Sequence, residues 1–95
     1  MNTQTKLLLR ECCNAFGADY DQLLTPARHR ELSDARKAFT VMALKHTSLN
    51  ITQIARCLRR DHSSICHAKV AAKQLIETDK TFARRINQIE QSIIK

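Results

Sequence analysis

Two adjacent arginines precede a run of short polar side chains in the second half of the sequence. Arg59 and Arg60 are followed at residues 61–64 by Asp-His-Ser-Ser, and Arg56 lies five residues before this run. Guanidinium groups bind phosphates well, and short hydrogen-bonding side chains in the first turn of a helix can reach base edges in the major groove. The N-terminal end of a helix also attracts phosphate. The pattern therefore predicts a nucleic-acid interface.

These residues need two helices and a tight corner to position them. Asn50 and Gln53 have the spacing of a capping box, and apolar residues then recur at helical spacing as far as Leu58. Asp61 is a good N-cap for the next helix, which leaves the two arginines in the corner. A short helix, a corner of about three residues and a longer helix form a helix-turn-helix.

The remaining apolar residues predict an all-α fold, a small bundle of about five helices that contains the helix-turn-helix. Before the helix-turn-helix we predict a helix over residues 5–16 that ends at Gly17, and then a helical turn over 19–24. An exposed basic loop over 27–31 follows, and then a helix from a cap at Ser33 to about residue 46. A last helix begins after Thr78 or Asp79. Positions predicted to face the core are Leu8, Leu9, Cys12, Phe16, Leu23, Leu24, Ala35, Ala38, Phe39, Met42, Ile51, Ile54, Ala55, Leu58, Ile65, Ala68, Ala72, Leu75 and Ile76, with His46 at the core's edge. An apolar stripe on the last helix is formed by Phe82, Ile86, Ile89 and Ile93.

Composition limits the class of protein. The 95 residues are enough for one domain, residues 1–95, with a small core. Lys and Arg exceed Asp and Glu by 16 to 9, a formal net charge of +7 that favours a polyanionic partner. No apolar run approaches the roughly 20 residues of a membrane span, and no signal peptide precedes the four cysteines. We therefore expect a soluble cytoplasmic protein that binds no membrane and whose cysteines are reduced.

The segment from Arg60 to Ala68 resembles the signature of a known family. It reads Arg-Asp-His-Ser-Ser-Ile-Cys-His-Ala, and the DNA-binding domain of the bacterial replication initiator DnaA has Asp-His-Thr-Thr-Val, a hydrophobic residue and His-Ala at this place. Leu-Leu-Thr at residues 23–25 and the basic loop after it are similar to the Leu-Leu-Ser and basic loop of that family. The resemblance extends over residues 7–75 and includes two further helices.

This resemblance implies a set of contacts with double-stranded DNA. In that family the signature reads a short A·T-rich box in the major groove, while an arginine of the basic loop enters the minor groove. Carried over by position, the residues that face bases or nearby phosphates are Asp61, His62, Ser63 and Ser64, the loop candidates are Arg28 and Arg30, and Arg36 and His67 match an arginine and a histidine of the family. The charge pattern adds Arg56, Arg59, Arg60 and Lys69 beside the recognition helix.

Three departures from the family pattern affect what the resemblance implies. The family usually has two glycines in the corner, whereas this chain has Leu58-Arg59-Arg60 and is one residue shorter there. Ser63 and Ser64 replace two threonines, so they lack the methyl group that can touch a thymine methyl, and we expect a relaxed preference among boxes. The initiator's ATPase module is also missing, because the 95 residues contain no Gly-rich loop ending in Gly-Lys-Ser/Thr.

A less specific interpretation exists for several of these residues. On this interpretation the arginines of the corner and of the loop are solvated charges that contact no DNA. Asp61 is then only a helix cap, and His67 is an interior histidine. Zinc is not expected, because Cys57, His62, Cys66 and His67 lack the paired spacings of structural zinc sites. A nucleophilic site is not expected either, because no third orienting group stands out.

The sequence thus predicts a non-enzymatic module without cofactor that binds a box like those of the initiator family and acts in DNA replication initiation or its regulation. A transcriptional regulator with an unrelated site is one alternative. Another is a helical module that pairs with a protein, either a host replication initiator or its own copy as a homodimer. The apolar stripe of the last helix fits a core or a dimer surface equally well.

Overall fold

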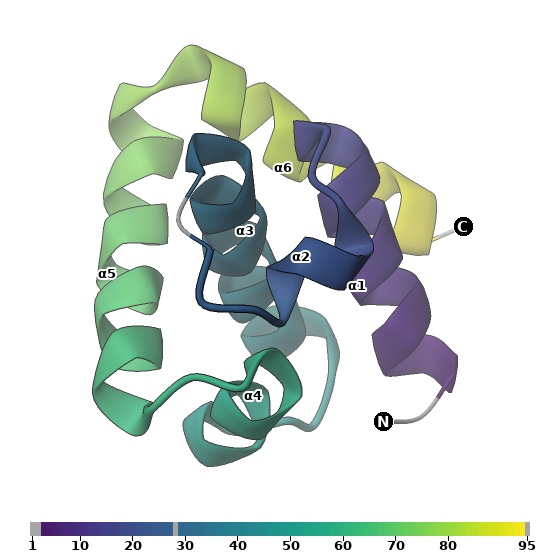
Figure 1. Ribbon diagram of the computed structural model, residues 1–95. Coiled ribbons are helices and arrows are strands. Elements are labelled where there is room, and N and C mark those ends of the chain that lie inside the picture. Colours follow the sequence, from purple (N-terminus) through teal and green to yellow (C-terminus); the bar gives the residue numbers. More distant parts are fainter. Residues whose placement is uncertain (1–2, 28, 95) are drawn as a thin grey trace.

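Six helices form the part of the chain that the computed structural model describes, residues 3–27 and 29–94, and no strand occurs there (Figure 1). The helices are α1 (Thr3–Phe16), α2 (Tyr20–Leu23), α3 (Arg30–His46), α4 (Ile51–Leu58), α5 (His62–Thr78) and α6 (Lys80–Ile93). The all-α prediction is confirmed. Five of the six helices correspond to the predicted helices. The additional one is the four-residue α2, which corresponds to the predicted helical turn.

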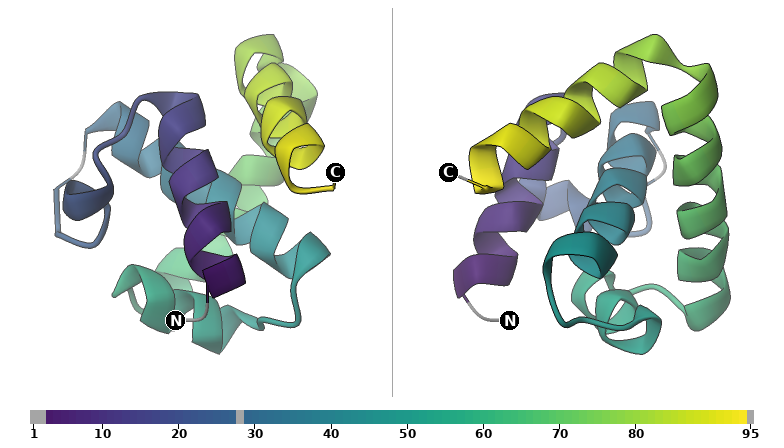
Figure 2. Two further views of the ribbon diagram at one scale, coloured as in Figure 1. Left: turned by 90° about the vertical axis from the view of Figure 1, so that its right-hand side faces the viewer. Right: turned by 180° about the vertical axis from the view of Figure 1, so that it is seen from behind.

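Helix α3 lies at the centre of the bundle and contacts every other helix (Figures 1 and 2). Leu32, Ala35, Ala38 and Phe39 on this helix are fully buried, as expected for a helix that other helices surround on several sides. Helix α5 packs along one side of α3 and helix α1 along another, while α4 crosses near the end of α3 at His46.

Helix α3 begins one turn earlier than predicted. His29 occupies the N-cap position and its carbonyl oxygen accepts a 3.0 Å hydrogen bond from the backbone N–H of Ser33. The predicted cap at Ser33 and the predicted loop over Arg30 and Glu31 are therefore wrong. No proline or glycine interrupts residues 29–33, and Glu31 is favourable at the positive end of the helix dipole.

Apart from Ser33, the predicted cap residues are confirmed, and so are most of the predicted core positions. Gly17 has the positive φ of 65° that a C-terminal helix cap needs, and Asp79 caps α6 through the backbone N–H groups of Thr81 and Phe82. One prediction on α5 is wrong, because Ile76 is 37% exposed. The stripe of α6 is mostly core, with Phe82, Ile86 and Ile89 buried and Ile93 half-buried.

All four cysteines are free thiols in this structure. Cys12 and Cys13 are buried, and this burial raises the pKa of both thiols, that of Cys13 to about 11. Cys57 and Cys66 are only half-buried. Within residues 3–27 and 29–94, no helix is both long and apolar enough to span a bilayer.

Candidate nucleic-acid interface

The helix-turn-helix of α4 and α5 is built by an N-terminal cap on each helix and a corner of three residues between them. Asn50 and Gln53 form the predicted capping box, with each side chain 2.9 Å from the other residue's backbone nitrogen. Helix α4 ends at Arg59, which adopts the left-handed conformation (φ 54°, ψ 44°), and the backbone N–H of Arg60 donates to the carbonyl of Ala55 at 2.9 Å. This left-handed turn ends α4 in the way a glycine commonly does.

Asp61 then begins α5. Its Oδ1 accepts a 2.7 Å hydrogen bond from the backbone N–H of Ser64, as a helix cap requires. Hydrogen bonds from Ser64 lower the pKa of the Asp61 carboxyl, and the nearby charges of Arg60 and His62 lower it further. The carboxylate is thus ionised at neutral pH and fixed in orientation.

The first turn of α5 presents its polar side chains to solvent. Residues 61–64 are all exposed, and so is His67 one turn later, whereas Ile65 between them is buried against the core. The Nδ1 atom of His62 lies 3.5 Å from Sγ of Cys66. The structure therefore exposes the predicted base-reading residues at the start of α5.

The arginines next to this turn differ in exposure. Arg56 and Arg59 are exposed, while Arg60 is half-buried and its Nη2 donates to the carbonyl oxygen of Thr25 at 2.8 Å. Lys69, a helical turn and a half beyond Ser64, is half-buried. The structure thus brings Arg56, Arg59 and Arg60 to the same end of α5 as residues 61–64.

Arg36 points into the protein. Its residue exposure is 8%, and its guanidinium donates to the carbonyl oxygens of Leu23, Thr25 and Ala27 at 2.8–3.0 Å. Burial lowers the pKa of Arg36, and the neighbouring Arg60 lowers it further. The direct DNA contact that the resemblance implied does not fit this buried guanidinium, which instead fixes the segment that follows α2.

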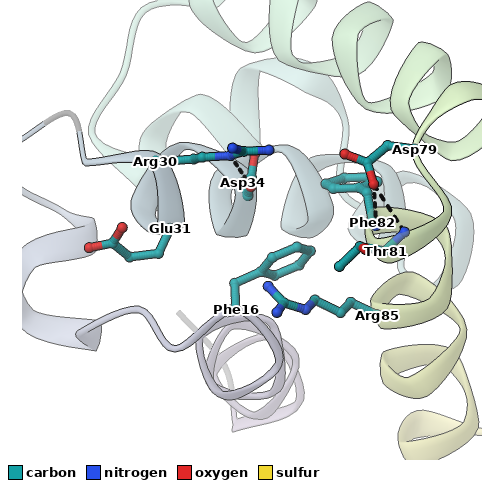
Figure 3. Close-up of a pocket in the computed structure, with 8 residues that line it drawn as sticks. All are labelled: Phe16, Arg30, Glu31, Asp34, Asp79, Thr81, Phe82 and Arg85. Carbon is teal, nitrogen blue, oxygen red and sulfur yellow. Dashed lines mark hydrogen bonds and ion pairs between the residues drawn. The ribbon is translucent and has the colours of Figure 1, made fainter.

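Arg30 lies near the other end of α5. Its guanidinium is on the rim of a pocket of about 310 Å³ beside Asp79 and Phe82, and its Nε is 3.8 Å from Asp34 (Figure 3). Arg85 in the same pocket lies over the ring of Phe16. A helix of the length of α5 is about 25 Å long, so the structure separates Arg30 from residues 61–64. Arg28, the other loop candidate, lies outside the described residues.

A hollow of about 420 Å³ adjoins the start of α5, and two of its residues had not been singled out in the sequence as ligand contacts. Ser33 and Lys37 of α3 line it together with Arg60, Ser64 and His67. Ser33 and Lys37 are four residues apart and so share a face of α3. The sequence does not reveal this shared face, because its pattern predicts that the helix starts with a cap at Ser33. The cationic side chains of Lys37 and Arg60 line this hollow together with apolar residues of α5. Among the described residues, no group of three or more His, Cys, Asp or Glu is arranged to hold a metal ion.

Comparisons with known proteins identify the family. Residues 5–70 match the family model of the bacterial DnaA protein helix-turn-helix. Over 89 residues the chain is 27% identical to the chromosomal replication initiator protein DnaA of Bacteroides thetaiotaomicron, an alignment that covers 93% of this chain and 19% of the relative. For the protein of the same name from Nostoc punctiforme the identity is 27% over 94 residues, covering 98% of this chain and 20% of the relative.

The chain spans about a fifth of the length of these relatives. The match nevertheless includes α4, the corner and the first turns of α5, where the exposed polar residues and the arginines meet. The chain belongs to the family of bacterial DnaA helix-turn-helix domains.

Proposed function

We propose that this protein binds double-stranded DNA in a sequence-preferring manner, with the first turn of α5 in the major groove. The observation that carries the proposal is the exposure of residues 61–64 at the end of α5 where Arg56 and Arg59 are also exposed. In a helix-turn-helix the N-terminal residues of the second helix contact base edges, and these side chains offer both donors and acceptors for such contacts.

The base-reading role in this proposal belongs to His62, Ser63 and Ser64. Asp61 is occupied as the cap of α5, where its carboxylate accepts hydrogen bonds from Ser64. The two serines lack the methyl group that would contact thymine, so we expect hydrogen bonds rather than apolar contacts to set the preference.

Phosphate contacts come from the cations around this turn. Arg56, Arg59 and Arg60 would face one strand at the corner, and the hollow beside α5 offers Lys37 and His67. Lys69 would reach the backbone from the next turn of α5. Such contacts supply most of the affinity but little sequence information. A minor-groove contact of the kind the resemblance implies would come from Arg28, because Arg30 lies near the far end of α5.

The context of this binding is DNA replication initiation or its regulation. The relatives carry the name chromosomal replication initiator protein, and we propose that this chain occupies the same class of box. These 95 residues contain no Gly-rich phosphate loop, so we propose that they act by binding DNA in the cytoplasm, without ATP hydrolysis or other catalysis.

Fluorescence anisotropy tests the proposal. A labelled duplex with an initiator-type box is compared with a scrambled duplex of equal composition at several salt concentrations, using the wild type, His62→Ala, Arg59→Ala and, as a control far from α5's first turn, Lys80→Ala. We expect a preference for the box of about tenfold or more, about 1.4 kcal/mol, which His62→Ala abolishes. Affinity should fall with log salt at a slope near −0.9 per phosphate contact.

The other outcomes contradict parts of the proposal. Equal and salt-sensitive binding to both duplexes would contradict base reading at a DnaA-type box and leave a DNA binder with another site. Absence of binding to either duplex at low salt would contradict DNA binding itself.

A further inference from the structure

Helices α3, α5 and α6 border one face of the bundle (Figure 2, right). Side chains of these three helices line a groove of about 540 Å³. Its floor is apolar, formed by Val41 and Met42 of α3 and Ile86 of α6, each at most 8% exposed. Ile76 of α5 lines the same groove and is 37% exposed, although its position in the helical pattern predicted burial. The groove therefore leaves apolar surface uncovered where an occupant would bury it.

The rim of this groove is basic. Lys69 and Lys73 are four residues apart on α5 and so lie on one face of it, and within the described part of the chain neither forms an ion pair. Lys45 on the opposite rim is already neutralised, because its Nζ donates to Oε2 of Glu90 at 2.6 Å. An occupant thus meets two unpaired cations on the α5 side.

We propose that this groove docks an acidic amphipathic segment of a partner protein. Apolar side chains at helical spacing would enter the floor, and carboxylates on the flank of the segment would meet Lys69 and Lys73. DNA can pair with the lysines but has no side chains to fill the apolar floor. A second copy of this chain is a poor occupant, because its net charge is +7.

The groove is separate from the proposed base-reading turn. Lys73 is 12 positions after Asp61 on α5, which corresponds to about 18 Å along the helix axis. Docking in the groove and base contacts by residues 61–64 are therefore compatible, with Lys69 the residue nearest to both surfaces. This would allow a partner to hold the protein while it is bound to a duplex.

A synthetic peptide tests this proposal. The probe is a fluorescein-labelled acidic peptide of about 15 residues, long enough for a marginal helix, with leucines at i, i+3, i+4 and i+7 and glutamates on the flanks. The control peptide has the same composition in an order that forms no stripe. The protein variants are Lys73→Glu and Ile76→Asp in the groove, with Lys80→Glu as the matched charge change outside it and His62→Ala as a change in the base-reading turn.

We expect the wild type to bind the striped peptide at least about tenfold more tightly than the control peptide. Lys73→Glu and Ile76→Asp should each weaken binding by about tenfold or more, while Lys80→Glu and His62→Ala leave it within about twofold. Thermal melts establish that each variant is folded, and amide shifts in NMR should map to α3, α5 and α6 around the groove.

Three results would overturn the proposal: equal binding of both peptides, an equal effect of Lys73→Glu and Lys80→Glu, or no saturable binding. Full displacement of the peptide by a duplex would also overturn it, because Lys73 would then belong to the DNA surface together with Lys69. Failure of DNA binding in the anisotropy experiment leaves this test unaffected, since the peptide needs no duplex.

Discussion

The guanidinium of Arg60 donates a 2.8 Å hydrogen bond to the carbonyl oxygen of Thr25, joining the corner before α5 to the segment after α2. Arg36 donates to the same carbonyl oxygen at 2.9 Å. One backbone carbonyl therefore connects a residue of the corner with a residue of the central helix. The orientation of α5 is set by α3 as well as by the local turn.

Replacement of Arg60 by alanine should weaken duplex binding and make it less sensitive to salt. The side chain supplies one cation near the start of α5, so the slope of log affinity against log salt should decrease by about one. Anisotropy titrations at several salt concentrations measure this slope. Arg84→Ala, an exposed arginine on α6, should leave it unchanged, and an equal decrease in both variants would show that only net charge matters.

Arg59 occupies a left-handed conformation that costs a non-glycine residue about 1 kcal/mol. Arg59→Gly should therefore raise the melting temperature by several degrees, roughly 4–8 °C per kcal/mol for a domain of this size. Arg59→Ala removes the same charge but keeps the Cβ atom, so it should show no such gain. Both variants should lose duplex affinity equally. Identical melting temperatures for Gly and Ala would contradict strain at this position.

Arg36 should be essential for stability rather than for direct contact with DNA. Arg36→Ala leaves the carbonyl groups of Leu23 and Ala27 without their donor, and we expect a loss of about 2–4 kcal/mol in the free energy of unfolding. Arg36→Lys should rescue little of it, because an ammonium group cannot reproduce the planar fork. Urea unfolding measures these values, with Lys37→Arg as the neighbouring control. If Arg36→Lys is as stable as the wild type, the planar geometry of the guanidinium is not the reason for the stability that Arg36 contributes.

Asp61 should make stability depend on pH in the acid range. Its pKa is lower in the folded protein than in the unfolded chain, so its contribution is present above the unfolded value and is lost as the pH falls through the folded one. Asp61→Asn keeps a capping side chain but removes the titration. Thermal melts from neutral to acid pH should show a shallower decline for Asp61→Asn than for the wild type. If the melting temperatures of the two proteins decline in parallel with pH, the acid sensitivity comes from other carboxyl groups, such as that of Glu90.

Local signals in the sequence were sufficient for much of the interface. The capping box at Asn50 and the cap at Asp61 depend on residues three positions apart, so they could be recognised without knowledge of the fold. The helical stripe of α4 fixed its buried face in the same way, with Ile54, Ala55 and Leu58 buried as predicted.

The features that the sequence did not reveal depend on contacts between distant segments. The sequence alone suggests that Arg36 is an exposed basic side chain. It points inward because it donates to the carbonyls of Leu23 and Ala27, which are 13 and 9 positions away. Ile76 lies on an apolar stripe but remains partly exposed, because it lines the open groove that α5 forms with α3 and α6. Spacing along one helix carries no information about where its neighbours separate.

Helix α1 packs against α6, and α1 begins and α6 ends on the side of the bundle opposite α5 (Figures 1 and 2). A polypeptide joined at either end would therefore leave the outer surface of α5 uncovered. Two copies connected by a flexible linker could occupy neighbouring boxes on one duplex, and the effective concentration of the second copy would depend on the length of that linker. The domain is thus suited to tandem fusion, in which avidity rather than the affinity of a single copy determines occupancy.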